Sequence, residues 1–79
     1  MDGFRDLRHQ VAASQSLPSP AVRRALRESA GVSLREIADP IKVTSEAVRL
    51  WELGLRRPSR EHLLGYLEAL RVLRDGGGS

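Results

Sequence analysis

The side chains richest in hydrogen-bonding groups gather between residues 44 and 57. Besides Glu52, this short stretch contains two hydroxyls, a carboxylate and three arginines: Thr44, Ser45, Glu46, Arg49, Arg56 and Arg57. A guanidinium forks onto phosphate oxygens or a guanine edge, a carboxylate accepts from an amino group, and a hydroxyl does either. On an arbitrary helix such a face is simply solvated, so its meaning depends on the elements that position it.

Catalytic and metal-binding groupings are not apparent in the sequence. The chain has no cysteine, which excludes disulfides, zinc–thiolate sites and thiol nucleophiles. His9 and His62 are far apart, and Asp6 near His9 supplies only a second ligand, too few for a site. No glycine-rich phosphate loop, serine elbow or catalytic pair of carboxylates occurs. We therefore expect no enzyme, no metal and no cofactor.

Length and charge describe a small basic domain. The chain has 79 residues, enough for one core. Its formal net charge is +3, and of its thirteen basic residues Lys42 is the single lysine, so the other twelve are arginine. Apolar runs of two or three residues cannot cross a membrane or form a signal peptide. Together with the absence of cysteine, this leads us to expect a cytoplasmic protein without membrane association.

Hydroxyl residues and glycines mark helix boundaries. Four of them stand where helices are expected to begin: Ser19, Ser33, Thr44 and Ser59. Glu36 completes a capping box with Ser33. Gly31 and Gly54 are expected to end the first and third helices in left-handed geometry. This punctuation predicts an all-α fold.

The predicted helices carry apolar residues at helical spacing. On the first helix the expected core face is Val22, Ala25, Leu26 and Ala30. On the third, Ala47, Val48 and Trp51 form the apolar face, opposite the polar one. On the fourth, which also carries Leu64, the residues assigned to the core are Leu63, Leu67 and Leu70.

The fourth helix carries more apolar surface than one core face needs. Tyr66, Val72 and Leu73 are expected to lie around its side. An extra apolar strip on a small domain indicates association. We expect a homodimer through this strip or through the N-terminal segment. The alternative is that the N-terminal segment folds back and covers the strip.

Proline shapes the connection between the second and third helices. Pro40 has no N–H and disfavours helical dihedral angles at Asp39, so the second helix is expected to end about there. Residues 40–43 then remain before the third helix begins at Thr44. Two short helices joined by so tight a turn must cross steeply, which is the helix-turn-helix arrangement.

The flanks divide the chain into three parts. Residues 1–18 form an N-terminal segment, with a weak amphipathic helix followed by a linker, "SQSLPSP", that leads into the first secure helix. In that segment Phe4, Leu7 and Val11 share one helical face. Residues 19–74 form the helix-turn-helix domain, and residues 75–79 form a flexible tail rich in glycine.

At "LRESAGVSLREIADPIKVTSEAVRLWELGLRRPS", residues 26–59, the chain resembles the DNA-binding domain of the lambda-repressor and Cro-like family, also called the xenobiotic-response-element family. The resemblance covers roughly residues 20–73. It implies a compact domain of four to five helices with a central helix-turn-helix, and a possible extra N-terminal helix. It also implies a structural ion pair between Arg27 and Glu52.

Two positions depart from the family's pattern. Lys42 stands where the family's turn usually has glycine, so either this lysine bears a left-handed conformation or the turn takes another path. Leu34 stands where the family often has a glutamine that reaches a phosphate. Arg35, or the backbone N–H groups at the start of this helix, would have to hold that phosphate instead.

Within a helix-turn-helix, the outward side chains of the second helix meet base edges in the major groove. The residues expected to read bases are Thr44, Ser45, Glu46, Arg49 and Leu50. Arg49 suits guanine, Glu46 suits cytosine, and Leu50 suits a thymine methyl group. Phosphate contacts are expected on either side, from Ser33, Arg35, Lys42, Arg56 and Arg57.

The sequence thus predicts a sequence-specific regulator of transcription that binds duplex DNA. The resemblance implies a palindromic operator and a small Cro-like repressor regulated by its own concentration. Such a protein would be associated with the bacterial nucleoid, or would act in the host cytoplasm if phage-encoded. Two alternatives stay open at this point: the antitoxin of a toxin–antitoxin pair, and an accessory factor for recombination or excision.

Overall fold

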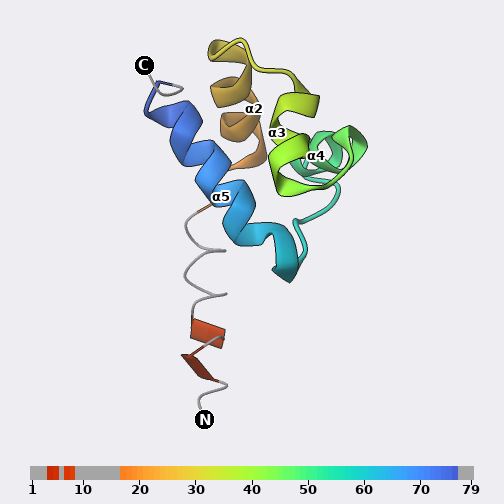
Figure 1. The fold of residues 1–79 in the computed structure, drawn as a ribbon, viewed down its shortest axis with the longest axis vertical. Helices are drawn as coiled ribbons and strands as arrows, with labels where there is room; N and C mark the ends of the chain where they lie inside the picture. The colour runs from red at the N-terminus through yellow and green to blue at the C-terminus, as the bar shows by residue number, and fades with distance from the viewer. Residues whose placement is uncertain (1–3, 6, 9–16, 77–79) are drawn as a thin grey trace.

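A computed structural model of the chain describes residues 4–5, 7–8 and 17–76. In residues 17–76 it has four helices and no strand: α2 (Pro20–Ser29), α3 (Leu34–Ile41), α4 (Ser45–Glu52) and α5 (Arg60–Arg74). α3 and α4 pack on each other, α2 packs on α4, and α5 lies against both α2 and α3 (Figure 1). The predicted all-α class is confirmed. None of the helices in the described ranges is long and apolar enough to cross a membrane.

The predicted caps stand at the helix starts. The Ser19 and Thr44 hydroxyls accept hydrogen bonds from the amides three residues ahead, at 3.4 and 3.0 Å. Ser33 and Glu36 form a reciprocal capping box: the Glu36 amide donates to the Ser33 hydroxyl at 3.1 Å, and the Ser33 amide donates to the Glu36 carboxylate at 2.9 Å. These bonds satisfy N–H groups that the first turn of a helix leaves without partners.

The second helix is longer than predicted, because Pro40 lies inside it. α3 runs to Ile41 instead of ending near Asp39. The last turn closes without a proline N–H, since the Lys42 amide donates to the carbonyls of Ala38 and Asp39 at 2.9 and 3.1 Å. The rule that proline ends a helix therefore failed here by about half a turn.

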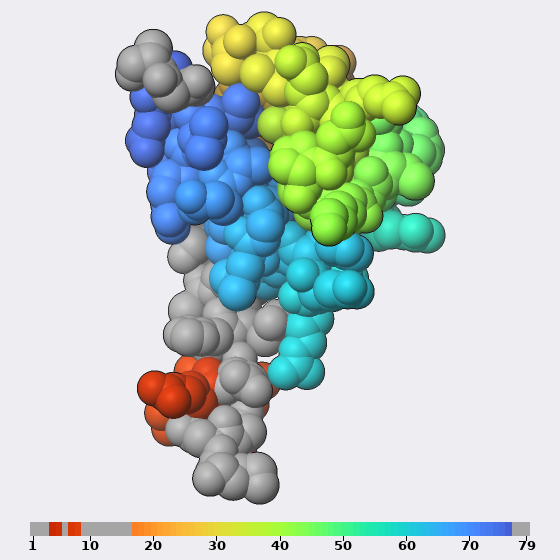
Figure 2. Space-filling view, viewed as in Figure 1, coloured from red at the N-terminus to blue at the C-terminus, as the bar shows by residue number. Residues whose placement is uncertain are grey.

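The core is built from side chains of α3, α4 and α5. Val48 is fully buried, and the Trp51 and Tyr66 rings lie 4.7 Å apart between centroids at an angle of 49°. Ile37 and Ala38 of α3 complete the centre of this cluster. Figure 2 shows how α3 and α5 meet along one face of the molecule. The predicted apolar face of α4 is thus the one that packs on the core.

The prediction for α5 was wrong in part. Tyr66 and Leu73 are buried core residues and not members of a lateral strip, whereas Leu67 is only half-buried. The buried positions of this helix are 63, 66, 70 and 73, whose alternating steps of three and four residues keep them on one narrow face. Of the predicted strip, only Val72 remains exposed.

The prediction for α2 was also wrong in part. Val22 is 47% exposed, Ala25 and Ala30 are exposed as well, and the buried residue of the helix is Arg23, at 7%. The face toward the core therefore lies one position further along the helix than hydrophobicity indicated. An arginine can occupy it because its stem is apolar, and its guanidinium lies 5.7 Å from the centroid of the Tyr66 ring.

The structure describes residues 4–5 and 7–8 of the N-terminal segment, which have helical backbone, and residues 17 and 18 at its end, where Leu17 packs against the core. The Phe4 and Leu7 side chains are largely exposed, so these two residues do not cover an apolar strip. The other expectations for this region, which concern Val11 and much of the linker, lie outside the described residues. So do most of the expected tail and the histidine at position 9.

Candidate nucleic-acid interface

The turn between α3 and α4 depends on Lys42. Its backbone is left-handed, with φ 67° and ψ 44°, and it is the one residue other than glycine with positive φ in the described part of the chain. Of the two alternatives for this position, Lys42 bears the strain, about 1–2 kcal/mol for an L-residue. The Val43 amide donates to the Ala38 carbonyl at 3.2 Å and closes the turn. With only residues 42–44 between them, α3 and α4 form a helix-turn-helix.

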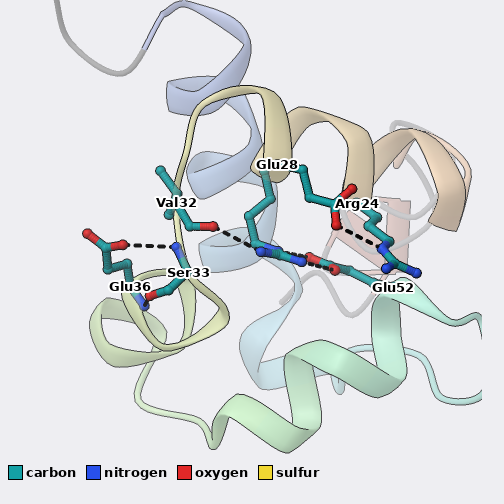
Figure 3. Close-up of polar contacts among 7 residues, drawn as sticks. Arg24, Glu28, Val32, Ser33, Glu36 and Glu52 are labelled. Atoms are coloured by element: carbon teal, nitrogen blue, oxygen red, sulfur yellow. Dashed lines mark hydrogen bonds and ion pairs between the residues drawn. The ribbon is translucent and has the colours of Figure 1, made fainter.

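An ion pair joins α4 to α2. The Arg27 guanidinium donates two hydrogen bonds to the Glu52 carboxylate, at 2.7 and 3.0 Å, and a third to the Val32 carbonyl at 2.9 Å. The two side chains are only 13% and 6% exposed. Figure 3 shows the two acceptor residues, Glu52 on α4 and Val32 in the loop after α2, which belong to different elements. The hydrogen bond to Glu52 raises the pKa of Arg27 above its ordinary value.

The opposite face of α4 is open to solvent. Thr44, Glu46 and Arg49 are exposed, while Ser45 and Leu50 are half-buried. All five of the residues predicted to read bases therefore lie on α4 or at its cap and away from Val48, which is fully buried. Because the buried Val48 and the Arg27–Glu52 pair fix the position of α4, its exposed polar groups have a defined geometry.

Two residues of this exposed face are paired with each other. Arg49 donates to the Glu46 carboxylate through Nε at 2.8 Å and through Nη2 at 2.7 Å. These hydrogen bonds lower the pKa of Glu46 and raise that of Arg49. Because a guanidinium has five N–H donors, three remain, including one on each terminal nitrogen. The pairing therefore leaves the end of the Arg49 fork available to an acceptor.

The residues predicted to contact phosphates differ in how many of their hydrogen-bond donors are already used within the protein. The Ser33 amide already donates to Glu36, and the Ser33 hydroxyl accepts from the Glu36 amide, so only its hydroxyl hydrogen can reach a phosphate. The hydrogen bond from the Ser33 backbone amide is the main cause that lowers the pKa of Glu36. A carboxylate thus already occupies the first turn of α3, where an anion would be attracted.

The cations around α4 are more accessible. Arg35 is exposed and lies 3.8 Å from the Asp39 carboxylate, a loose pair. Lys42, Arg56 and Arg57 are exposed and make no ion pair within residues 17–76 of the structure. They lie in the turn before α4 and in the loop after it, so that they flank the polar face at both ends.

Leu34 has a structural role in place of the missing glutamine. It is half-buried and packs against the core cluster. It also lines a surface hollow of about 240 Å³ together with Arg27, Arg49 and Glu52. Leucine here shields the flank of the ion pair that holds α4.

No metal-binding grouping of three His, Asp or Glu side chains occurs in the part of the chain that the structure describes. His62 Nδ1 lies 2.8 Å from the Ser59 hydroxyl. Ser59, unlike the other three caps, makes no side-chain hydrogen bond to the backbone of its helix.

Sequence reasoning missed Arg23. It stands four residues before Arg27 on α2, and residues at this spacing share a helix face. That spacing was the available signal, since the resemblance already placed Arg27 toward Glu52. A search for hydrophobic residues alone does not find Arg23, because arginine is seldom buried.

Comparison with known proteins gives one result at the level of the family. A family model described as helix-turn-helix matches residues 24–75, which include the later part of α2 and all of α3, α4 and α5. No curated protein matches the chain. No solved structure matches it either.

Proposed function

Because the chain belongs to the lambda-repressor and Cro-like helix-turn-helix family, a family of DNA-binding regulatory domains, we propose that it is a sequence-specific repressor. It occupies an operator in duplex DNA through α4 in the major groove. The observation that carries this proposal is the polar face of α4, with Arg49 exposed and the helix held from behind by Val48 and by the Arg27–Glu52 pair.

In this proposal Arg49 reads a guanine. Glu46 holds the side of the guanidinium through Nε and Nη2, and the outer hydrogens of the two terminal nitrogens face the guanine O6 and N7 atoms. Glu46 accepts from a neighbouring cytosine amino group with the lone pairs that Arg49 leaves free. Thr44, Ser45 and Leu50 contact the adjoining bases.

The surrounding cations fix the register of α4 on the duplex. Lys42 before the helix, and Arg56 and Arg57 after it, contact phosphates on either side of the groove. Arg35 also contacts a phosphate after its loose pair with Asp39 breaks. Ser33 donates its hydroxyl hydrogen to a phosphate. These contacts are independent of base sequence and make binding sensitive to salt.

Two copies on a palindrome would place their recognition helices about 34 Å apart, one turn of DNA. Tyr66 and Leu73 cannot supply the contact between the copies, since both are buried in the core. Selection of bound sequences from random duplexes tests the operator directly. We expect a recovered site with a guanine at the Arg49 position and, for a dimer, two half-sites at that spacing. Failure to enrich any sequence would contradict specific binding.

A pair of variants separates base reading from phosphate contact. Arg49→Ala should weaken binding to the selected site by roughly 10- to 100-fold and relax the preference at one base pair. Arg57→Ala should weaken binding to selected and random duplexes alike, and lower the salt slope by about one. Arg74→Ala removes the same charge at the far end of α5 and serves as the control. Identical behaviour of Arg49→Ala and Arg57→Ala on both duplexes would refute the assignment.

A further inference from the structure

The buried guanidinium of Arg23 lacks a partner. Only 7% of the residue is exposed, and in the described part of the chain no acceptor lies within hydrogen-bond distance of its buried Nε. The Tyr66 ring, whose centroid lies 5.7 Å from the Arg23 guanidinium, offers a π-face, and the buried Tyr66 hydroxyl makes no hydrogen bond in the described part of the chain. Burial raises the pKa of Tyr66, and the nearby Arg23 charge opposes that rise. A buried cationic N–H without an acceptor is costly. A group outside the core could compensate this charge through the terminal nitrogens of the same guanidinium, because Arg23 lines a cavity.

Arg23 lines a cavity of about 330 Å³ between the start of α2 and the loop after α4. The other charged residues that line it are Arg56 and Arg57, so all three charged groups of the wall are guanidinium ions and none is a carboxylate. Arg27, one helical turn from Arg23, is already neutralised by Glu52. The cavity therefore has an uncompensated positive charge.

The walls of the cavity are held in place. Gly54 has φ +73°, and a Cβ atom there would lie 3.3 Å from Cγ of Pro20, so the loop packs tightly against the first residue of α2. Pro18 and Pro58 line the same cavity and have restricted backbones. The positive end of the α2 dipole, capped by Ser19, also faces this region. Rigid walls mean that a bound group would not have to order the site first.

We propose that this cavity binds a phosphate group, with Arg23 as its buried anchor and Arg56 and Arg57 closing over it. A phosphate presents several acceptor oxygens in different directions. It therefore suits three guanidinium groups better than a carboxylate, whose two oxygens lie in one plane. The phosphate could come from the DNA backbone or from a free phosphate compound. The first source rests on the proposed function, and the second does not.

The direct test is a titration of the protein with inorganic phosphate at constant ionic strength, followed by amide NMR. The Gly54 amide should shift saturably, and phosphate should raise the melting temperature. Both effects should vanish in Arg23→Leu and persist in Arg74→Leu, which loses the same charge outside the cavity. Absence of saturable binding to the unmodified protein, or its persistence in Arg23→Leu, would overturn the proposal.

Arg23→Leu should fold, since replacing a buried charge by an apolar side chain is often neutral or stabilising. If its circular dichroism nonetheless showed unfolding, Arg57→Ala decides the question, because Arg57 is exposed and lines the same cavity. This variant should bind phosphate at least several-fold more weakly than Arg74→Leu. Equal phosphate affinity in the two variants would overturn the proposal.

Binding to duplex DNA distinguishes the two sources. If the phosphate belongs to the DNA backbone, Arg23→Leu should weaken binding to selected and random duplexes alike, beyond the effect of Arg74→Leu. If it belongs to a free compound, Arg23→Leu should lose phosphate binding while its DNA affinity matches that of Arg74→Leu. A chain that binds phosphate but no duplex would refute the proposed function and leave the cavity site supported.

Discussion

Two arginine–glutamate pairs involve α4, one joining it to α2 and one lying within it, and they have nearly the same geometry. Arg27 meets Glu52 through two hydrogen bonds of 2.7 and 3.0 Å, and Arg49 meets Glu46 through two of 2.8 and 2.7 Å. Their surroundings differ. The first pair is 13% and 6% exposed, whereas the second is 49% and 59% exposed.

The comparison shows that burial, and not bond length, decides what an ion pair does. Water screens the Glu46–Arg49 pair and can replace either partner, so the pair can rearrange when a new acceptor arrives. The Arg27–Glu52 pair has little water to replace it, and removing one partner would leave a charge unpaired inside the protein. One pair therefore serves the fold, and the other is suited to recognition.

The largest expected effect is that of Glu52→Ala. We expect the free energy of unfolding to fall by about 3 kcal/mol, the low end for a broken buried pair, because Arg27 keeps some contact with solvent. Urea denaturation measures the change. Glu28→Ala is the matched control. It breaks the exposed pair between Glu28 and Arg24, both on α2, and should have little effect on the free energy of unfolding. Equal losses in the two variants would contradict the distinction between buried and exposed pairs.

Glu46→Ala should have a smaller effect, and on binding more than on folding. The urea midpoint should stay close to that of the unmodified chain, because both partners are exposed. Arg49 would lose the carboxylate that orients it, and a negative charge facing the DNA would disappear. We expect the ratio of specific to random-duplex affinity to fall by a few-fold, less than in Arg49→Ala. An unchanged ratio would show that Glu46 neither orients Arg49 nor reads a base.

The smallest effect concerns pH. The hydrogen bonds from Arg49 lower the pKa of Glu46, so the stability that this pair contributes is present above the ordinary glutamate value, about 4.3, and is lost as the pH falls through the lowered pKa. Carboxyl NMR titration should show a low pKa for Glu46 that rises in Arg49→Ala. Glu36 is the internal reference, because Ser33 and not Arg49 lowers its pKa. A Glu46 titration unaffected by Arg49→Ala would mean that the pair does not persist in solution.

The sequence predicted the helix starts well, because a cap is a contact between residues three apart. Ser33 with Glu36, and Thr44 at the start of α4, follow from neighbouring residue types alone. The apolar face of α4 also followed from spacing, since Val48 and Trp51 are both strongly hydrophobic. The end of α3 did not, because a proline in a last turn is acceptable when a later amide, here that of Lys42, closes the helix.

The faces of α2 and α5 were harder to predict. Several apolar side chains compete for the core on each helix, and spacing alone allows more than one solution. The structure buries Tyr66 against Trp51 and lets Arg23 cover that ring, a choice that depends on the relative placement of three helices. Hydrophobicity favoured Val22 over Arg23 because it does not count the apolar stem of an arginine.

By itself, the sequence determined an all-helical chain with a helix-turn-helix and a polar face on its second helix, since caps, turns and helical periodicity depend on residues a few positions apart. Only the tertiary structure decided which arginine–glutamate pair is protected from water, and that Arg23 lies buried beside a basic cavity. Those properties depend on groups far apart in the chain, such as Arg27 and Glu52, that folding brings into contact. Solvent exclusion then gives identical side chains different roles.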